Sequence, residues 1–209
     1  MISLIYPEGD FAPIVPARKA DDVKAMFAGK DRMGMSKELK NQEWLPVIQD
    51  DGQVIAMATR EYCHNGSGLL HPVVHLHVLD RYGRLYLQKR SMNKRCQPGK
   101  WDTAVGGHVD YGETVMEALM RETQEELGLT RFNPIAIKNY IFEFGKDREM
   151  VFVFAAVGNA FSIRPNPEEI EEGRFWTREE IDGALGMGVL TPNFEGEFSA
   201  IRKKLYALL

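Results

Sequence analysis

The 209-residue chain is poor in cysteine, which excludes several classes of protein. Its two cysteines, Cys63 and Cys96, are too few for a disulfide framework or a four-cysteine zinc site. No apolar run is long enough for a transmembrane helix. The start, MISLIYPEGDF, lacks the basic flank and long apolar stretch of a signal peptide. We therefore expect a cytoplasmic protein with no membrane partner.

Excess basic charge is also lacking. The net charge is -4 and the pI is about 5.8, so the chain has no broad positive field for nucleic acid or an anionic membrane. Internal repeats and low-complexity tracts are absent from the sequence as well. The length and the ordinary composition suit one domain, or one domain with an appendage.

Residues 1–42 differ in pattern from the rest of the chain. The stretch PEGDFAPIVP holds three prolines in ten residues, which favours irregular chain, and residues 20–30 are predicted to form a short helix. We expect an N-terminal extension at 1–42 and one folded domain at 43–209.

From Trp44 onward, strand patterns alternate with a few helical patterns. Strands are predicted at 44–48, 54–60, 71–80, 84–91, 139–145, 148–158 and 172–177, and residues 101–109 are predicted as a strand that runs into a glycine-containing loop. Helices are predicted at 114–127, 178–185 and 198–209. This order predicts an α/β or α+β sandwich.

The stretch RETQEELGL, residues 121–129, places three carboxylates within little more than one helical turn: Glu122, Glu125 and Glu126. The apolar stripe of the predicted helix consists of Val115, Ala118 and Leu119. At about 100° per residue, Glu122 and Glu126 fall on that stripe and Glu125 lies at its edge. Two of the three carboxylates are therefore expected to face the protein.

Carboxylates on a buried face cost several kcal/mol each unless they are paired or bind a metal. Arg121 is the only cation in the stretch, and one cation cannot neutralise three anions. Hard divalent cations prefer oxygen ligands, so the pattern predicts a Mg²⁺ or Mn²⁺ site. A solvated helix face is the alternative interpretation, and the position of Glu122 and Glu126 on the apolar stripe disfavours it.

The segment GHVDYGETVMEALMRETQEELGL resembles the Nudix box. That motif is Gly, five residues, Glu, seven residues, then Arg-Glu-hydrophobic-any-Glu-Glu-any-Gly-hydrophobic. The matching positions are Gly107, Glu113, Arg121, Glu122, Glu125, Glu126, Gly128 and Leu129. Thr123 departs from the pattern, because an aliphatic residue is usual there, but its methyl group can still pack.

The resemblance spans roughly residues 43–190 and implies a Nudix hydrolase domain, with a mixed β-sheet sandwiched between α-helices and the box as loop-helix-loop. The metal ligands that it implies are Glu122, Glu125, Glu126 and a backbone carbonyl near Gly107. Glu122 would also orient or deprotonate a water. Glu113 and Arg121 would form a structural ion pair, and Gly128 belongs to the structural part of the box.

Stretches around the box resemble the isopentenyl-diphosphate isomerase-like branch of this superfamily. They are EWLPVIQDDGQVIAMATRE, GLLHPVVHLHVLD and LYLQKRSMNKRCQPGKWDTAVGGHV. Gly106 occupies the place of the isomerase's catalytic cysteine, and Cys96 lies some ten residues upstream. The thiol that an isomerase requires is therefore missing at this position.

The same resemblance matches His71 and His108 to positions that help to bind a metal in the isomerases, with Glu149 and Asp147 completing the set. A reused metal site and a mere likeness of short motifs are both open interpretations. Glu149 fits either a ligand or catalytic base, or an ordinary surface residue of a hairpin.

Four further histidine and tryptophan positions have a plain structural interpretation. His75 and His77 alternate on the strand face of His71, which favours a polar sheet face over metal ligands. His64 is interpreted as a loop residue. Trp101 could stack on a base, but a place in the core is favoured.

Lys89 and Arg90 lie at the end of a predicted strand, where cations could meet the phosphates of a substrate. Surface charge with no partner is the alternative. Neither residue belongs to the box.

The leading prediction is a Mg²⁺-dependent Nudix pyrophosphohydrolase that cleaves a phosphoanhydride bond in a nucleoside diphosphate linked to another moiety. Isomerisation of a prenyl diphosphate is an alternative, which Gly106 disfavours. A non-catalytic nucleotide-sensing module is another, which the intact box and the short extension disfavour. The expected partners are a small diphosphate substrate and, by resemblance, a second copy in a homodimer, with no nucleic acid.

Overall fold

The computed structural model describes residues 42–94 and 96–209. Apart from Gln42, the predicted N-terminal extension and its short helix at 20–30 lie outside the described residues.

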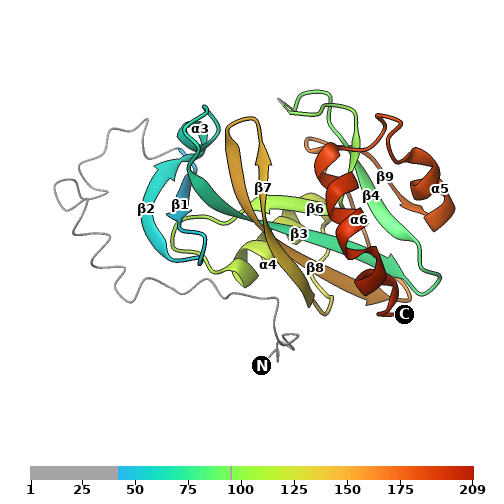
Figure 1. Cartoon of the computed structure of the whole chain (residues 1–209). Coiled ribbons are helices and arrows are strands. Elements are labelled where there is room, and N and C mark those ends of the chain that lie inside the picture. Colours follow the sequence, from blue (N-terminus) through green and yellow to red (C-terminus); the bar gives the residue numbers. More distant parts are fainter. Residues whose placement is uncertain (1–41, 95) are drawn as a thin grey trace.

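The strands are β1 (Trp44–Ile48), β2 (Val54–Thr59), β3 (Leu70–Asp80), β4 (Leu85–Arg90), β5 (Trp101–Asp102), β6 (Val105–His108), β7 (Ile135–Phe144), β8 (Asp147–Gly158) and β9 (Ile170–Trp176). The helices are α3 (Arg60–Cys63), α4 (Val115–Leu127), α5 (Arg178–Ala184) and α6 (Pro192–Tyr206). Within the described residues, a seven-stranded sheet follows the path β5-β4-β3-β8-β7, with β6 on β3 and β9 on β4. Strands β1 and β2 form a separate hairpin (Figure 1).

The large sheet is mixed, because β3 and β8 run parallel while its other pairs are antiparallel. Alternate residues of a strand face opposite sides. Leu76 and Phe152 therefore pack in the cluster that contains Leu119 of α4, whereas Val73 packs in the cluster that contains Phe198 of α6. Helices cover both faces, as Figure 1 shows, and the predicted α+β fold is confirmed.

Helix α4 begins and ends on local signals in the sequence. The Thr114 hydroxyl accepts a hydrogen bond from the backbone N–H of Glu117, and the Glu117 carboxylate accepts one from the Thr114 N–H, which together form a capping box. Gly128 ends the helix with φ of 60°, the left-handed region that glycine enters without strain. Buried Thr123 packs its methyl group as expected and donates its hydroxyl to the Leu119 carbonyl at 2.6 Å.

The C-terminal helix differs from the prediction. It begins at Pro192, six residues before the predicted start at 198. Thr191 caps it by accepting from the Phe194 N–H, and a proline fits the first turn because an N–H there would have no helical partner. Two smaller differences are that β7 begins at Ile135, before the predicted 139, and that α3 was not predicted.

The remaining structural expectations concern single side chains and membrane spans. Trp101 is 8% exposed and meets Trp176 edge-on, so its predicted place in the core is confirmed. Cys63 is buried and Cys96 exposed, both as free thiols. In the part of the chain that the structure describes, no helix is both long and apolar enough to cross a membrane.

Candidate functional site

Helix α4 presents the three carboxylates of the RETQEELGL stretch at graded depth. Glu126 is 7% exposed, the side chain of Glu122 is 14% exposed, and that of Glu125 is 58% exposed. This is the order that the apolar stripe predicts. A β-carbon at Gly107 would overlap the carboxyl group of Glu122, so a larger residue there would displace the Glu122 side chain from its place beside β6.

Arg121 makes hydrogen bonds both to residues before helix α4 and to carboxylates on the helix itself. Its guanidinium forms a bidentate ion pair with Glu113, with two bonds of 2.9 Å, as predicted. It also donates to the His108 carbonyl at 2.9 Å, to Glu122 at 2.7 Å and to Glu125 at 3.2 Å. One cation is thus shared among three carboxylates and leaves the cluster short of positive charge.

Glu126 has no cationic partner among the described residues. Its Oε2 accepts hydrogen bonds from the Gln88 side chain at 2.9 Å and from the Gly106 N–H at 3.4 Å. Burial, and then the charge of Glu122, raise the pKa of Glu126 to about 8. Burial also raises the pKa of Glu122, although Arg121 opposes this. A divalent cation would favour the charged form of both groups, so the donor set fits one.

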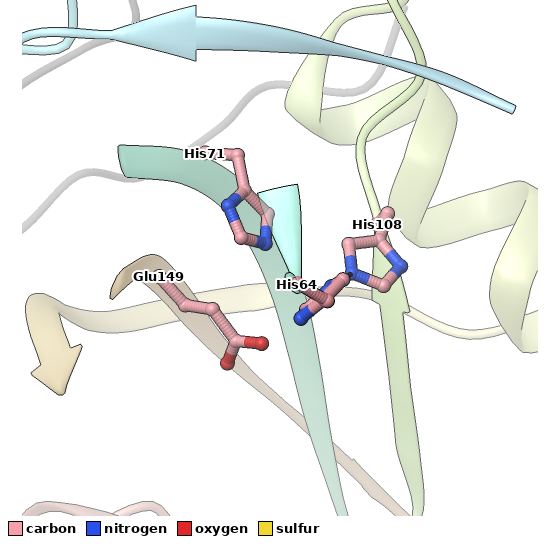
Figure 2. Close-up of side chains that lie close together, drawn as sticks. All are labelled: His64, His71, His108 and Glu149. Atoms are coloured by element: carbon pink, nitrogen blue, oxygen red, sulfur yellow. Dashed lines mark hydrogen bonds between the residues drawn. The ribbon is translucent and has the colours of Figure 1, made fainter. Parts of the chain in front are cut away.

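A second group of possible ligands lies on the other face of β6. Atoms of His64, His71, His108 and Glu149 all lie within 4.8 Å of one another. They come from the end of α3, from β3, from β6 and from β8, and Figure 2 shows them converging. Three imidazoles and a carboxylate suit a transition ion such as Mn²⁺ or Zn²⁺ better than Mg²⁺.

The hydrogen bonds of this histidine cluster leave lone pairs free. His71 Nδ1 donates to the Leu69 carbonyl at 3.0 Å, and its buried Nε2 has no hydrogen-bond partner. Burial lowers the pKa of His71 to about 4 and holds the pKa of His108 well below its ordinary value. Burial raises the pKa of Glu149. Neutral imidazoles are the form that binds a metal, so the cluster fits one.

His64 was missed by the sequence interpretation, which left it in a loop. The structure places it at the C-cap of α3, with its Nε2 2.9 Å from Nε2 of His108. Asp147 touches the cluster only at its edge, 3.5 Å from Nδ1 of His64. Because α3 has only four residues, no periodic pattern could reveal it.

Other predicted candidates lie apart from the box. Lys89 pairs with Glu171 at 3.2 Å and Arg90 with Asp102 at 3.3 Å, so neither contacts the box carboxylates. The neighbouring Gln88, which was not predicted, contacts Glu126 instead.

His75 and His77 share the face of His71, as predicted, but their hydrogen bonds lead away from the histidine cluster. Both bind the carboxylate of buried Glu197 on α6. Glu197 was missed because it lies in the part of α6 that the sequence did not predict as helix.

Two features define a class of α+β domains with a loop-helix-loop metal motif. One is a mixed sheet between helices, and the other is a carboxylate-bearing helix that follows a glycine-containing strand. The family model described as NUDIX domain matches residues 69–194, more than half of the chain. The chain therefore belongs to the Nudix family.

Known proteins of two kinds are similar to this chain. A Nudix hydrolase of Yersinia pestis is 31% identical over 140 residues, covering 66% of this chain and 75% of that protein. An isopentenyl-diphosphate Delta-isomerase of Brevibacterium linens is 30% identical over 152 residues, covering 68% of this chain and 81% of that protein. The crystal structure of DR0079 from Deinococcus radiodurans shares the fold, with TM-score 0.67 and 23% identity, covering 76% of this chain and 99% of that one.

The close approach of α4 to β6 predicts that alanine substitutions at two neighbouring glycines change the stability of the fold by different amounts. Gly107→Ala should lower the free energy of unfolding by about 1–3 kcal/mol, because its methyl group displaces Glu122. Gly106→Ala is the matched control, since its methyl group would meet His75 at ordinary contact distances of 3.4 and 3.5 Å. Urea unfolding of both variants measures the difference. Equal losses of stability would show that Glu122 is not held against β6.

Proposed function

We propose that this chain is a divalent-metal-dependent Nudix hydrolase that cleaves a phosphoanhydride bond in a nucleoside diphosphate linked to another moiety. The observation that carries the proposal is the placement of Glu122 and Glu126, desolvated against the backbone of Gly106 and Gly107. Among the described residues, Arg121 forms an ion pair with Glu122, and Glu126 has none. The products would be a phosphate ester and a nucleotide or inorganic phosphate.

Each residue of the box has a role in this proposal. A bound Mg²⁺ or Mn²⁺ would neutralise the diphosphate and lower the pKa of the attacking water. Glu122, Glu125, Glu126 and the carbonyl of Gly107 would hold it. Glu122 would also orient the attacking water or accept its proton.

Arg121 and Glu113 would position the carboxylates of the site and would take no part in the reaction itself. Their bidentate pair, and the bonds from Arg121 to the His108 carbonyl and to Glu122, hold Glu122 against the end of β6. Rigid placement of this kind is what a reacting water and a phosphorus atom require.

The histidine cluster is proposed as a second metal site, formed by His64, His71, His108 and Glu149. The support is the unpartnered Nε2 of His71 and the lowered pKa values of His71 and His108, which favour their neutral forms. Glu149 is also proposed as a second carboxylate for proton transfer, since burial raises its pKa.

Isomerisation of a prenyl diphosphate is the second candidate function. The histidine cluster and the isomerase of Brevibacterium linens favour it. Gly106, at the position that resembles the isomerase's catalytic cysteine, disfavours it because glycine has no group to move a proton. Conversion of isopentenyl diphosphate without release of phosphate would support the isomerase.

Glu122→Gln is predicted to abolish hydrolysis, with a loss of at least about 100-fold and little change in folding, because the amide can neither balance a cation nor accept a proton. The assay follows the phosphate-ester, nucleotide and phosphate products formed with Mg²⁺ from nucleoside diphosphate sugars, dinucleoside polyphosphates, nucleoside triphosphates, NADH, coenzyme A and isopentenyl diphosphate. Glu179→Gln, at an exposed position of α5, is the matched control.

Full activity of Glu122→Gln would contradict the assignment. If the wild-type chain forms none of these products from any compound but binds a nucleotide in calorimetry, the nucleotide-sensing module becomes the better description.

The histidine cluster is predicted to bind one Mn²⁺ in addition to any held by α4. In equilibrium dialysis, His71→Ala should bind one Mn²⁺ fewer per chain than the wild type, because it removes the imidazole with the free Nε2. His77→Ala is the control, since His77 is also fully buried on this face but lies outside the cluster. An unchanged count in His71→Ala would show that the cluster holds no ion.

A further inference from the structure

A buried polar network lies between β3 and α6, beyond the histidine cluster. Glu197 Oε2 is 2.9 Å from His75 Nδ1, and Glu197 Oε1 is 2.6 Å from His77 Nε2. The hydroxyl of Tyr140 lies 2.8 Å from Glu197 Oε2 and 2.9 Å from Asn193 Oδ1. A carboxylate only accepts, so Glu197 fixes a proton on Nδ1 of His75.

The other edge of the His75 ring points at Gly106. These two residues are paired across β3 and β6, and a β-carbon at Gly106 would lie 3.4 Å from Cδ2 and 3.5 Å from Nε2 of His75. Nε2 makes no hydrogen bond to any described residue, and the side chain of His75 is 10% exposed. His77 differs, because its ring is fully buried and its free nitrogen lies 3.5 Å from the Thr103 hydroxyl.

The network holds His75 in its charged form. Burial alone would lower the pKa of His75, but the charge and hydrogen bond of Glu197 outweigh it, with further support from Asp102 and Glu149, and raise the pKa to about 9. The charge and hydrogen bond of His75 likewise outweigh the burial of Glu197 and lower its pKa. The pair therefore directs a donating, positively charged nitrogen toward Gly106.

Gly106 lies between the two groups of candidate ligands. Its N–H meets Glu126 of the box at 3.4 Å. Two residues along β6, about 7 Å of strand, His108 enters the histidine cluster. An anionic oxygen above the bare α-carbon of Gly106 would therefore meet His75 and lie on the face of β6 that carries the histidine cluster.

We propose that His75 is a further substrate-binding residue, whose Nε2–H donates a hydrogen bond to a phosphate oxygen lying over Gly106. Glu197 is its positioning residue. The inference rests on the proposed hydrolase function and adds to it the place of the phosphate, on the α6 side of β6.

The test uses methylenediphosphonate, a diphosphate that cannot be hydrolysed, with Mg²⁺ and the full chain. His75→Gln should weaken its binding in calorimetry about tenfold, the size expected for loss of a charge-assisted hydrogen bond. His77→Gln is the matched control, because it also loses a bond to Glu197 but not one that faces Gly106, and should change binding less than about twofold. Gly106→Ala should weaken binding, since its methyl group fills the proposed place of the oxygen.

Two spectroscopic and pH readouts separate binding from a structural role. In ¹⁵N-histidine NMR, the Nε2 signal of His75 should move on addition of methylenediphosphonate, while that of His77 stays. In Glu197→Gln, binding should be lost at lower pH than in the wild type, because His75 loses its proton earlier without the carboxylate. In the wild type the loss should follow the pKa of His75, about 9.

Each outcome decides between the two proposals. If methylenediphosphonate binds the wild type and His75→Gln equally and leaves the His75 signal unmoved, the pair is a structural element of the core and the inference is wrong, while the hydrolase proposal stands. If methylenediphosphonate does not bind the wild type at all, the diphosphate substrate class and the inference fall together.

Discussion

The approach of helix α4 to strand β6 is the constraint on which the rest of the site depends. A β-carbon at Gly107 would overlap the carboxyl group of Glu122, so the glycine leaves room for this side chain beside β6. The capping box at Thr114, the left-handed Gly128 and the bonds from Arg121 to Glu113 and the His108 carbonyl hold the helix in place. The consequence is a cluster of partly buried carboxylates with too few cations nearby to neutralise their charge.

Strand β6 lies between the two groups of candidate ligands. Its successive residues face opposite sides of the sheet, so this one short strand contributes to both groups. Gly107 faces α4 and Glu122, while Gly106 and His108 face the side of α6. The raised pKa values of Glu122, Glu126 and Glu149 and the lowered values of His71 and His108 have the same cause, because burial disfavours the charged form of each group. A bound cation would offset the free-energy cost of burying the charged carboxylates, and the lone pairs of the neutral imidazoles could coordinate it.

Local signals made most of the fold and the carboxylate site predictable. The helical period alone placed Glu122 and Glu126 on the buried face, because a helix has fixed geometry. His64 and Glu197 were missed for different reasons. Helix α3 is too short to show a helical period, and α6 begins at a proline, Pro192, so its first residues were not predicted as helix. The partners of Glu126 and His75 come from 38 and 122 residues away, so only the folded topology brings them together.

The most direct measurement is anomalous diffraction from crystals of the full chain grown with Mn²⁺. The proposed function predicts an anomalous peak within bonding distance of Glu122, Glu126 and the Gly107 carbonyl, where the structure crowds carboxylates around one guanidinium. A peak confined to His64, His71, His108 and Glu149, with α4 free of metal at saturating Mn²⁺, would contradict it. The box carboxylates would then be a buried charge cluster that needs another explanation.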